Sequence, residues 1–320
     1  MCQVAVLNFL SISDLFCATI CHIRKERGIR MSKTASSLCV LAAGVLWGCI
    51  SLFLRPLTEL GFSSIQSVAI RTTLSFIILF VFLGVTRPRL LKIRLKDIPL
   101  FIGTGMLSLL FFSLCYFAAI GEAGVSVAVV LLYTSPVFVM LMSAAFFGEK
   151  LTKVKLIALI MTLAGCVFVS GMLTEGQSIG IKALTLGLMS GFGYALYSIF
   201  GRIALRYCDT MTITVYTFAF AALGSNIAAL LSQGAPVTAL FVPEGMFAAF
   251  GIALFCCVAP YLLYTKGLAG IETGRAAILA AVEPVVGMLI GVFIFSEGMT
   301  AVKFIGMALI LTSIVMLSKE

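Results

Sequence analysis

Glu283 is the residue of greatest chemical interest, because it lies in the middle of the largely apolar stretch 272–295. In a membrane-spanning helix that rises 1.5 Å per residue, its carboxylate would lie about 16 Å from the helix start. A charge at that depth costs several kcal/mol unless it is paired, hydrated or protonated. Gly287 and Gly291 follow at steps of four, so Glu283 shares a small-residue face that packs against other helices. Two interpretations stand side by side: desolvation makes Glu283 a proton-coupling group, or it is a structural acid, protonated or bound to Arg71.

Arg71 is the corresponding basic residue, and it interrupts the apolar stretch 64–85. It would lie about 10 Å from the end of its helix. From there its side chain could reach the membrane surface, neutralise Glu283, or bind an anionic group of a small molecule. We treat Arg71 and Glu283 together as candidate coupling or charge residues.

Aromatic and hydroxyl side chains in the interior of other apolar stretches are candidates for the walls of a cavity. Aromatic rings with a polar group suit an organic molecule, or an amine through cation–π contact. Anchoring at the membrane surface is the alternative explanation for membrane tyrosines, but Trp47, Tyr194 and Tyr197 lie well inside their stretches. The predicted cavity residues are Trp47, Ser51, Tyr116, Ser135, Tyr194, Tyr197, Ser198 and Tyr264.

Enzymatic chemistry has no support in the sequence. The sole histidine, His22, precedes the apolar stretches, so we expect no catalytic histidine and no histidine-rich metal site. No GxxxxGK phosphate loop is present, which excludes ATP as the energy source. The ten cysteines show no CxxC spacing and are interpreted as reduced, buried small residues. We expect no cofactor, no metal and no nucleic-acid partner.

The elements that position these residues are membrane-spanning helices. The chain is 61% hydrophobic and 11% charged, whereas about 25% of residues are charged in an ordinary soluble domain. Ten stretches approach the ~20 apolar residues that cross a bilayer, and no strand-like alternation runs through the chain. The sequence predicts an all-α integral membrane protein with ten transmembrane helices.

The ten helices form two copies of one unit. Residues 116–170 align without gaps on 264–318 at an offset of 148, with 16 of 55 positions identical. The preceding parts align at an offset of 147, which places Trp47 on Tyr194 and Ser51 on Ser198. We assign the first repeat to 34–174 and the second to 181–318. Because each repeat has five helices, the copies are inverted in the membrane, as in transporters that expose a central site alternately to either side.

The basic residues predict the orientation. With the N-terminus inside, 18 of the 22 Lys and Arg lie on the cytoplasmic side, as the positive-inside rule requires. Both termini are therefore expected in the cytoplasm, and the net charge of +9 reflects topology. We expect a multi-pass protein of the bacterial cytoplasmic membrane.

Pro136 and Pro284 occupy the same repeat position, near the middle of their helices. Proline cannot donate a backbone hydrogen bond, so the carbonyls of Leu132 and Ala280 lose their partners and both helices should kink. Such carbonyls are tolerated in a membrane only where protein or water satisfies them. The kinks are expected beside the central cavity, although membrane helices also accept proline for no functional reason.

These motifs together resemble the drug/metabolite transporter superfamily, in its ten-helix branch with two EamA repeats. The resemblance rests on Trp47-Gly48, Arg71, Ser135-Pro136 with Gly148-Glu149, and Glu283-Pro284 with Glu297, and it covers about 36–318. It implies a secondary carrier, often an exporter, of small metabolites such as amino acids or amines. Tyr194-Ala195 departs from the Trp-Gly pair of the first repeat.

Three points stay open at this stage. A channel or a lipid scramblase on the same fold is the alternative function. Protons are a candidate coupling ion, and the oligomeric state is undetermined. Residues 1–33 precede the repeats as a cytoplasmic extension, for which a membrane-surface anchor is one interpretation; we expect residues 1–30 to be non-native, with Met31 the working start.

Overall fold

The computed structural model describes residues 31–172, 179–232 and 234–318. Within these ranges the chain is helical and contains no strand, which confirms the all-α prediction. The described helices belong to one compact unit, Lys33–Glu320. Nearly all of the predicted extension 1–33, with His22, lies outside the described residues.

The first half of the chain folds into five membrane-length helices, several of which are interrupted. Gly124, with φ 77°, divides α6 into the end of the third helix and the start of the fourth. The segments, in order, are α2 (Lys33–Gly48), α3 (Ser51–Glu59), α4 (Ser64–Thr86), η1 (Pro88–Leu91), η2 (Leu95–Asp97), α5 (Ile98–Ile102), η3 (Gly103–Leu110), α6 (Phe111–Leu132), α7 (Ser135–Phe147) and α8 (Lys153–Ser170).

The second half repeats this plan. Its segments are α10 (Ile181–Ala204), α11 (Thr210–Leu230), η4 (Val237–Phe241), α12 (Pro243–Ala253), η5 (Leu254–Val258), α13 (Ala259–Leu268), α14 (Thr273–Ala280), α15 (Glu283–Phe293) and α16 (Ala301–Ser318). In the described part of the chain, nine continuous helical runs are long and apolar enough to cross a membrane, and one of them, Leu95–Phe147, has 53 residues. Because Gly124 divides that run, the predicted ten helices are present.

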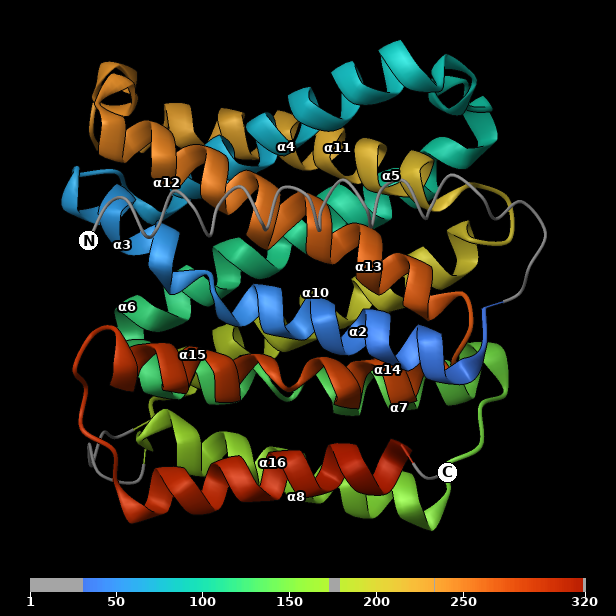
Figure 1. Cartoon of the computed structure of the whole chain (residues 1–320), viewed down its shortest axis with the longest axis vertical. Helices are drawn as coiled ribbons and strands as arrows, with labels where there is room; N and C mark the ends of the chain where they lie inside the picture. The colour runs from blue at the N-terminus through green and yellow to red at the C-terminus, as the bar shows by residue number, and fades with distance from the viewer. Residues whose placement is uncertain (1–30, 173–178, 233, 319–320) are drawn as a thin grey trace. The chain divides into compact units, whose positions relative to one another are not determined.

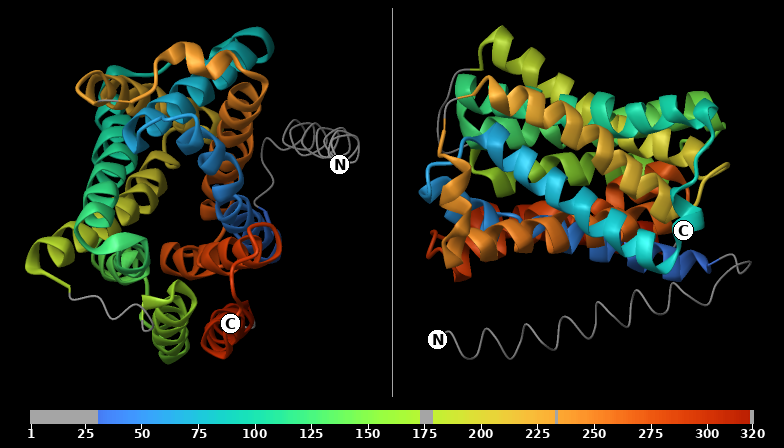
Figure 2. Two further views of the ribbon diagram at one scale, coloured as in Figure 1. Left: turned by 90° about the vertical axis from the view of Figure 1, so that its left-hand side faces the viewer. Right: turned by 90° about the horizontal axis from the view of Figure 1, so that it is seen from above.

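Helices of the first half pair with helices of the second half. The pairs are α2 with α13, α4 with α11, α6 with α10, α7 with α14, and α8 with α16 (Figure 1). Exchanging the two repeats maps this set of pairs onto itself, as a two-fold relation between the halves requires. The pair α8 and α16 runs in opposite directions and lies side by side in Figures 1 and 2.

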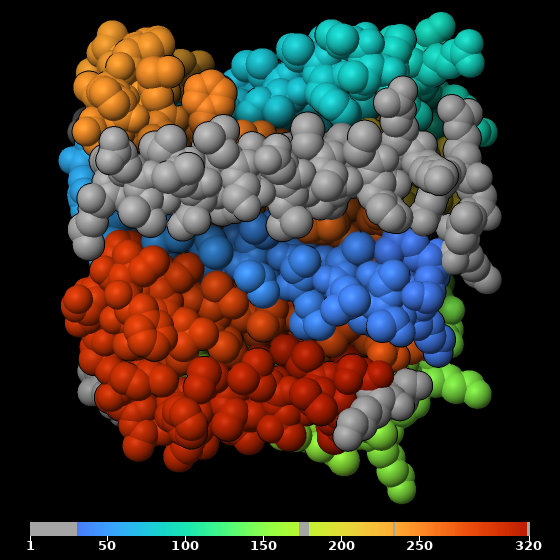
Figure 3. All heavy atoms as spheres, in the orientation of Figure 1, coloured from blue at the N-terminus to red at the C-terminus, as the bar shows by residue number. Residues whose placement is uncertain are grey.

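The first helix packs against the interrupted ninth helix. In the space-filling view the blue α2 lies directly against the orange and red segments of the second half (Figure 3). A methyl group at Gly44 would lie 2.7 Å from the carbonyl oxygen of Ala280, and one at Gly48 would lie 2.7 Å from that of Glu283. Only glycine allows this approach, so the Gly44-x-x-x-Gly48 motif brings α2 onto the break between α14 and α15.

The loops divide between two ends of the helical unit. Loops 87–97, 148–152, 205–209 and 269–272 lie together at what we call the basic end (Figure 1). The first of these loops carries five Lys and Arg residues. Loops 60–63, 234–242 and 294–300 lie at the opposite end (Figure 1). The two ends are the natural candidates for the two faces of the membrane.

Candidate functional site

A cavity of about 400 Å³ lies between the two halves of the molecule. Both repeats supply its walls, and it reaches the opposite end, where Glu297 and Lys303 line it. Its described lining includes no residue from the basic-end loops. Six of the ten predicted cavity and charge residues line this cavity: Trp47, Ser51, Arg71, Tyr116, Tyr194 and Glu283.

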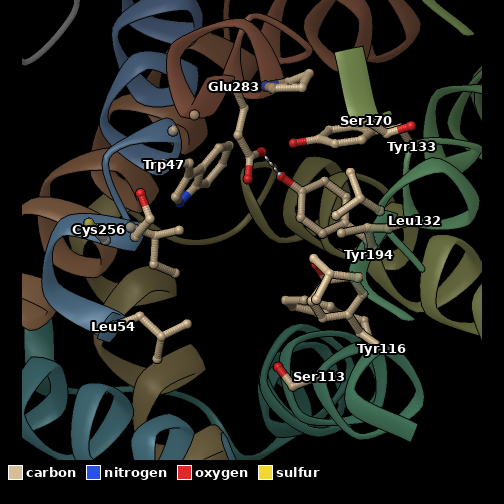
Figure 4. Close-up of a pocket in the computed structure, with 18 of the residues that line it drawn as sticks. Trp47, Leu54, Ser113, Tyr116, Leu132, Tyr133, Ser170, Tyr194, Cys256 and Glu283 are labelled. Carbon is tan, nitrogen blue, oxygen red and sulfur yellow. Dashed lines mark hydrogen bonds between the residues drawn. The ribbon is translucent and has the colours of Figure 1, made fainter. Parts of the chain in front are cut away.

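Glu283 sits at the break in the ninth helix, as the first residue of α15. The hydroxyl of Tyr194 donates a hydrogen bond to its Oε2 atom at 3.3 Å (Figure 4). The Tyr133 hydroxyl also interacts with the carboxylate. Phenolic donors and the partial positive charge of a helix N-terminus both favour an acid here, which reduces the cost of placing it at membrane depth.

The two prolines occupy equivalent places after helix breaks. Pro136 follows the break at Tyr133–Thr134, and Pro284 follows the break at 281–282. The carbonyl oxygens before each break meet a glycine of another helix: Leu132 faces Gly191, as Ala280 faces Gly44. Gly44 and Gly191 are themselves repeat equivalents, so both breaks are covered in the same way. Pro284 lines the cavity, whereas the described lining does not include Pro136.

An aromatic cluster forms one side of the cavity. The Trp47 ring lies 6.3 Å from that of Tyr194, and 5.3 Å from those of Tyr261 and Tyr264. Sequence reasoning missed Tyr261 and Tyr133, which line the cavity too. Two signals could have found them: Tyr261 is one helical turn from Tyr264, and Tyr133 is three residues from Pro136.

Four predicted cavity residues do not line the cavity in this conformation. The Ser198 and Tyr264 hydroxyls share a hydrogen bond of 2.7 Å, and the Tyr197 hydroxyl shares one of 2.7 Å with Thr265. Ser135 is 3% exposed. These side chains are buried because they satisfy one another or pack within the helix bundle, so their role as substrate-cavity residues stays a prediction.

Arg71 and Glu283 line the same cavity without an ion pair between them. Instead, the Arg71 Nη2 atom donates a hydrogen bond of 3.3 Å to Ser113. Its Nε atom is buried and has no hydrogen-bond partner among the described residues. The structural interpretation in which Arg71 binds Glu283 directly is therefore absent from this conformation.

The basic end is closed by contacts between the repeats. The Glu149 carboxylate accepts hydrogen bonds from the backbone amides of Thr273 at 2.7 Å and Gly274 at 3.1 Å, at the start of α14. Lys155 forms an ion pair with Glu272. Each contact joins the segment between the fourth and fifth helices to the start of the ninth helix, so together they seal this end of the cavity.

The repeat equivalents of these residues make different contacts. Glu297 forms a half-exposed ion pair of 2.6 Å with Arg55, although its equivalent Glu149 binds helix amides. Lys303 is half-buried, whereas its equivalent Lys155 is 3% exposed. Equivalent residues at the two ends of the molecule therefore differ in their contacts and in their burial.

An inverted ten-helix repeat around a central cavity defines a membrane transporter rather than an enzyme. The EamA-like transporter family model matches residues 34–171 and 181–319, so the chain belongs to this family. The match confirms the family resemblance seen in the sequence motifs.

Several relatives support this assignment. An uncharacterized transporter from Archaeoglobus fulgidus is 29% identical, over 88% of this chain and 95% of the relative. A probable amino-acid metabolite efflux pump from Salmonella typhimurium is 24% identical, over 72% of this chain and 78% of the relative. A solved crystal structure, 19% identical, shares the fold with a TM-score of 0.78 over 90% of this chain and 98% of that one.

Proposed function

We propose that this protein is a secondary transporter that exports small organic metabolites, such as amino acids or amines, across the cytoplasmic membrane by alternating access. Membership of the EamA-like family supports the transporter class. The name of the Salmonella typhimurium relative supports amino-acid metabolites as cargo and export as the direction. The size of the cavity, about 400 Å³, falls in the range of small-molecule sites.

The observation that carries the mechanism is the unequal environment of equivalent residues. Ser51 and Tyr116 line the cavity, whereas their equivalents Ser198 and Tyr264 are buried and hydrogen-bonded to each other. If the repeats exchanged conformations, Ser51 and Tyr116 would become buried, and the cavity would open at the basic end instead. Such an exchange is how inverted repeats convert one open state into the other.

Cysteine accessibility tests this proposal. Ser51→Cys and Ser198→Cys are made separately in a chain whose ten native cysteines are replaced. A membrane-impermeant thiol reagent should reach Ser51→Cys from the face at the opposite end and Ser198→Cys from the face at the basic end. Saturating substrate should change the two labelling rates in opposite directions, because both report one equilibrium.

The same experiment addresses a channel or a scramblase. A continuous pore would let reagent from either face label both positions at once, and that result would contradict alternating access. Mass spectrometry of the medium and the cytosol, with and without overexpression, identifies the cargo and its direction. Accumulation of the cargo in the cytosol rather than the medium would contradict export.

A further inference from the structure

One face of α4 presents polar groups to the cavity. Ser64, Ser67, Val68 and Arg71 all line it, and their spacing of three, four and seven residues places them on one side of the helix. The cavity therefore meets a serine-rich strip that ends in a guanidinium group. An apolar wall would be expected if the cargo were entirely hydrophobic.

The donors on this strip are only partly used by the protein. The Arg71 Nε atom and the Ser67 hydroxyl are both buried and have no hydrogen-bond partner among the described residues. By contrast, Arg94 holds Asp97 through two nitrogen atoms, and Arg202 donates to two backbone carbonyls. Leaving buried donors unsatisfied is costly, so a cavity that retains them is suited to an acceptor that arrives with the ligand.

We propose that Arg71 and Ser67 bind a carboxylate group of the transported molecule, an inference that rests on the proposed transport function. A guanidinium presents planar, parallel donors that match a carboxylate, and Ser67 lies one helical turn before Arg71 on the same face. The aromatic cluster around Trp47 and Tyr194 then faces the organic part of the molecule.

The charge balance of the cavity favours a carboxylate over a phosphate. Its lining contains two basic residues, Arg71 and Lys303, and two acidic residues, Glu283 and Glu297. A phosphate with nearly two negative charges would meet as many acidic as basic groups. A carboxylate carries one charge and needs only Arg71 with neighbouring hydroxyl groups.

The first test compares exported compounds in cells that overproduce the full chain or its variants. Compounds whose appearance in the medium depends on the unaltered protein should carry a carboxylate, and Arg71→Gln should lower their export about 10- to 100-fold. Arg71→Lys should restore part of it, and Ser67→Ala should cost less. Thermal unfolding of each purified variant shows whether it is folded.

The outcomes separate this inference from the proposed function. If no compound depends on the protein, the transport proposal fails. If dependent compounds lack a carboxylate, or a folded Arg71→Gln exports them normally, transport stands and the carboxylate site is wrong.

A second experiment applies if Arg71→Gln fails to fold. In proteoliposomes containing the unaltered protein, the methyl ester and the amide of the exported compound should compete for transport at least tenfold less well than the acid. Equal competition would overturn the proposal, and stronger competition by a phosphate analogue would indicate phosphate recognition.

A separate observation, at the closed basic end, supports a second inference. Lys155 is 3% exposed and pairs with Glu272 at the start of the ninth helix. In the other repeat, Lys303 is the equivalent of Lys155, but Gly124 takes the place of Glu272. The opposite end can therefore copy the Glu149 contact through Glu297, but it has no acid at the position equivalent to Glu272. The nearby acid Glu122 forms an ion pair with Lys182 instead.

We infer that the Lys155–Glu272 pair makes closure of the basic end the more stable state of the empty protein. Opening this end would break the pair, and the opposite end has no acid at the equivalent position to replace it. Only the lysine of this pair is buried, since the Glu272 side chain is 49% exposed. Losing Glu272 is therefore destabilising because it leaves the buried Lys155 charge without its acidic partner. Because Gly124 stands where an acid would be needed, the empty protein favours the state in which the basic end is closed over the state in which the opposite end is closed.

Glu272→Gln tests this bias. In the empty protein it should raise the labelling rate of Ser198→Cys from the basic-end face and lower that of Ser51→Cys from the other face, each about fivefold. Lys303→Gln is the matched control, because that lysine donates to the Gly298 carbonyl and forms no ion pair among the described residues, and it should not shift the rates in this direction. Unchanged labelling rates in Glu272→Gln, or an equal shift in Lys303→Gln, would overturn the inference.

Discussion

The Glu283 carboxyl group accepts a hydrogen bond from a neutral side chain and forms no ion pair among the described residues. Tyr194 donates a hydrogen bond to it, and Arg71 lines the same cavity but donates to Ser113 instead. A carboxyl group satisfied by neutral donors can take up and lose a proton with less change in its surroundings than one fixed in an ion pair. This arrangement supports the proton-coupling interpretation over a direct pairing with Arg71.

Glu283→Gln should abolish accumulation driven by a pH gradient, so that the transported compound reaches equal concentrations on both sides. Exchange of the compound at equal pH should persist, because glutamine keeps the volume and the hydrogen bonding while it removes the titration. Both fluxes are measured in proteoliposomes with labelled compound. If the variant keeps the pH dependence of the unaltered protein, Glu283 is structural and coupling lies elsewhere.

Trp47 offers a direct optical report on the cavity, because it is the only tryptophan of the chain. It lines the cavity and contacts the rings of Tyr194 and Tyr261. Binding of the exported compound to the purified protein should therefore change tryptophan emission with a saturating dependence on concentration. Trp47→Phe should remove the signal, and a change that never saturates would indicate nonspecific partitioning.

At the scale of elements, close helix contacts hold the helix breaks in place. Gly48→Leu should destabilise the protein by about 1–3 kcal/mol, because a methyl group there already meets the Glu283 carbonyl and Val286. It should also reduce transport, since it displaces the start of α15. Gly84→Leu is the matched control: a methyl group at that position would meet nothing within 4 Å. Thermal unfolding of both variants tests this, and equal melting temperatures would contradict it.

The turns after the fourth and ninth helices carry different residues at their left-handed position. Gly148 has φ 68° and its repeat equivalent Ser296 has φ 57°, and both precede the glutamates at the two ends. A left-handed conformation is strained for serine but not for glycine. Ser296→Gly should therefore stabilise the protein by about 1 kcal/mol, and Ser296→Ala should not. A denaturant titration of both variants measures the difference, and a less stable glycine variant would show that the serine side chain matters.

Local features explain which elements could be predicted from the sequence. The ten helices follow from apolar stretches, and the interruptions at Pro136 and Pro284 follow from a missing backbone donor. The π-helical turns η3 (Gly103–Leu110) and η5 (Leu254–Val258) were not predicted, although they occupy corresponding parts of the two repeats. A π-turn leaves no periodic signature in a stretch that is apolar on all sides, and such turns are often found at functional sites.

At the scale of the whole molecule, symmetry limited the prediction of the cavity. Ser51 and Ser198 are equivalent in sequence, and so are Tyr116 and Tyr264. The sequence therefore assigns both members of each pair to the cavity, whereas one conformation exposes only one of them. Which member is exposed depends on which end is closed, and that is a property of the conformational state.

The two ends should face opposite sides of the membrane, with the basic end in the cytoplasm. Loop 87–97 carries five Lys and Arg residues, and such loops stay on the cytoplasmic side during insertion. In a cysteine-replaced chain, an impermeant maleimide should label Glu59→Cys at the opposite end in intact cells. It should label Lys92→Cys only after the cells are made permeable. Both native side chains are exposed, so accessibility within the protein is not limiting.

The reverse labelling pattern would invert the topology and the direction assigned to this conformation. With the basic end in the cytoplasm, the contacts made by Glu149 and Lys155 close the cavity toward the cytoplasm.

The cavity then opens to the outside of the cell, which is the state from which an exporter releases its cargo. An exporter must next close around an empty cavity and reopen inward, so the Lys155–Glu272 pair should slow this return step. Glu272→Gln should therefore speed the return of the empty carrier, measured as net efflux relative to exchange in proteoliposomes.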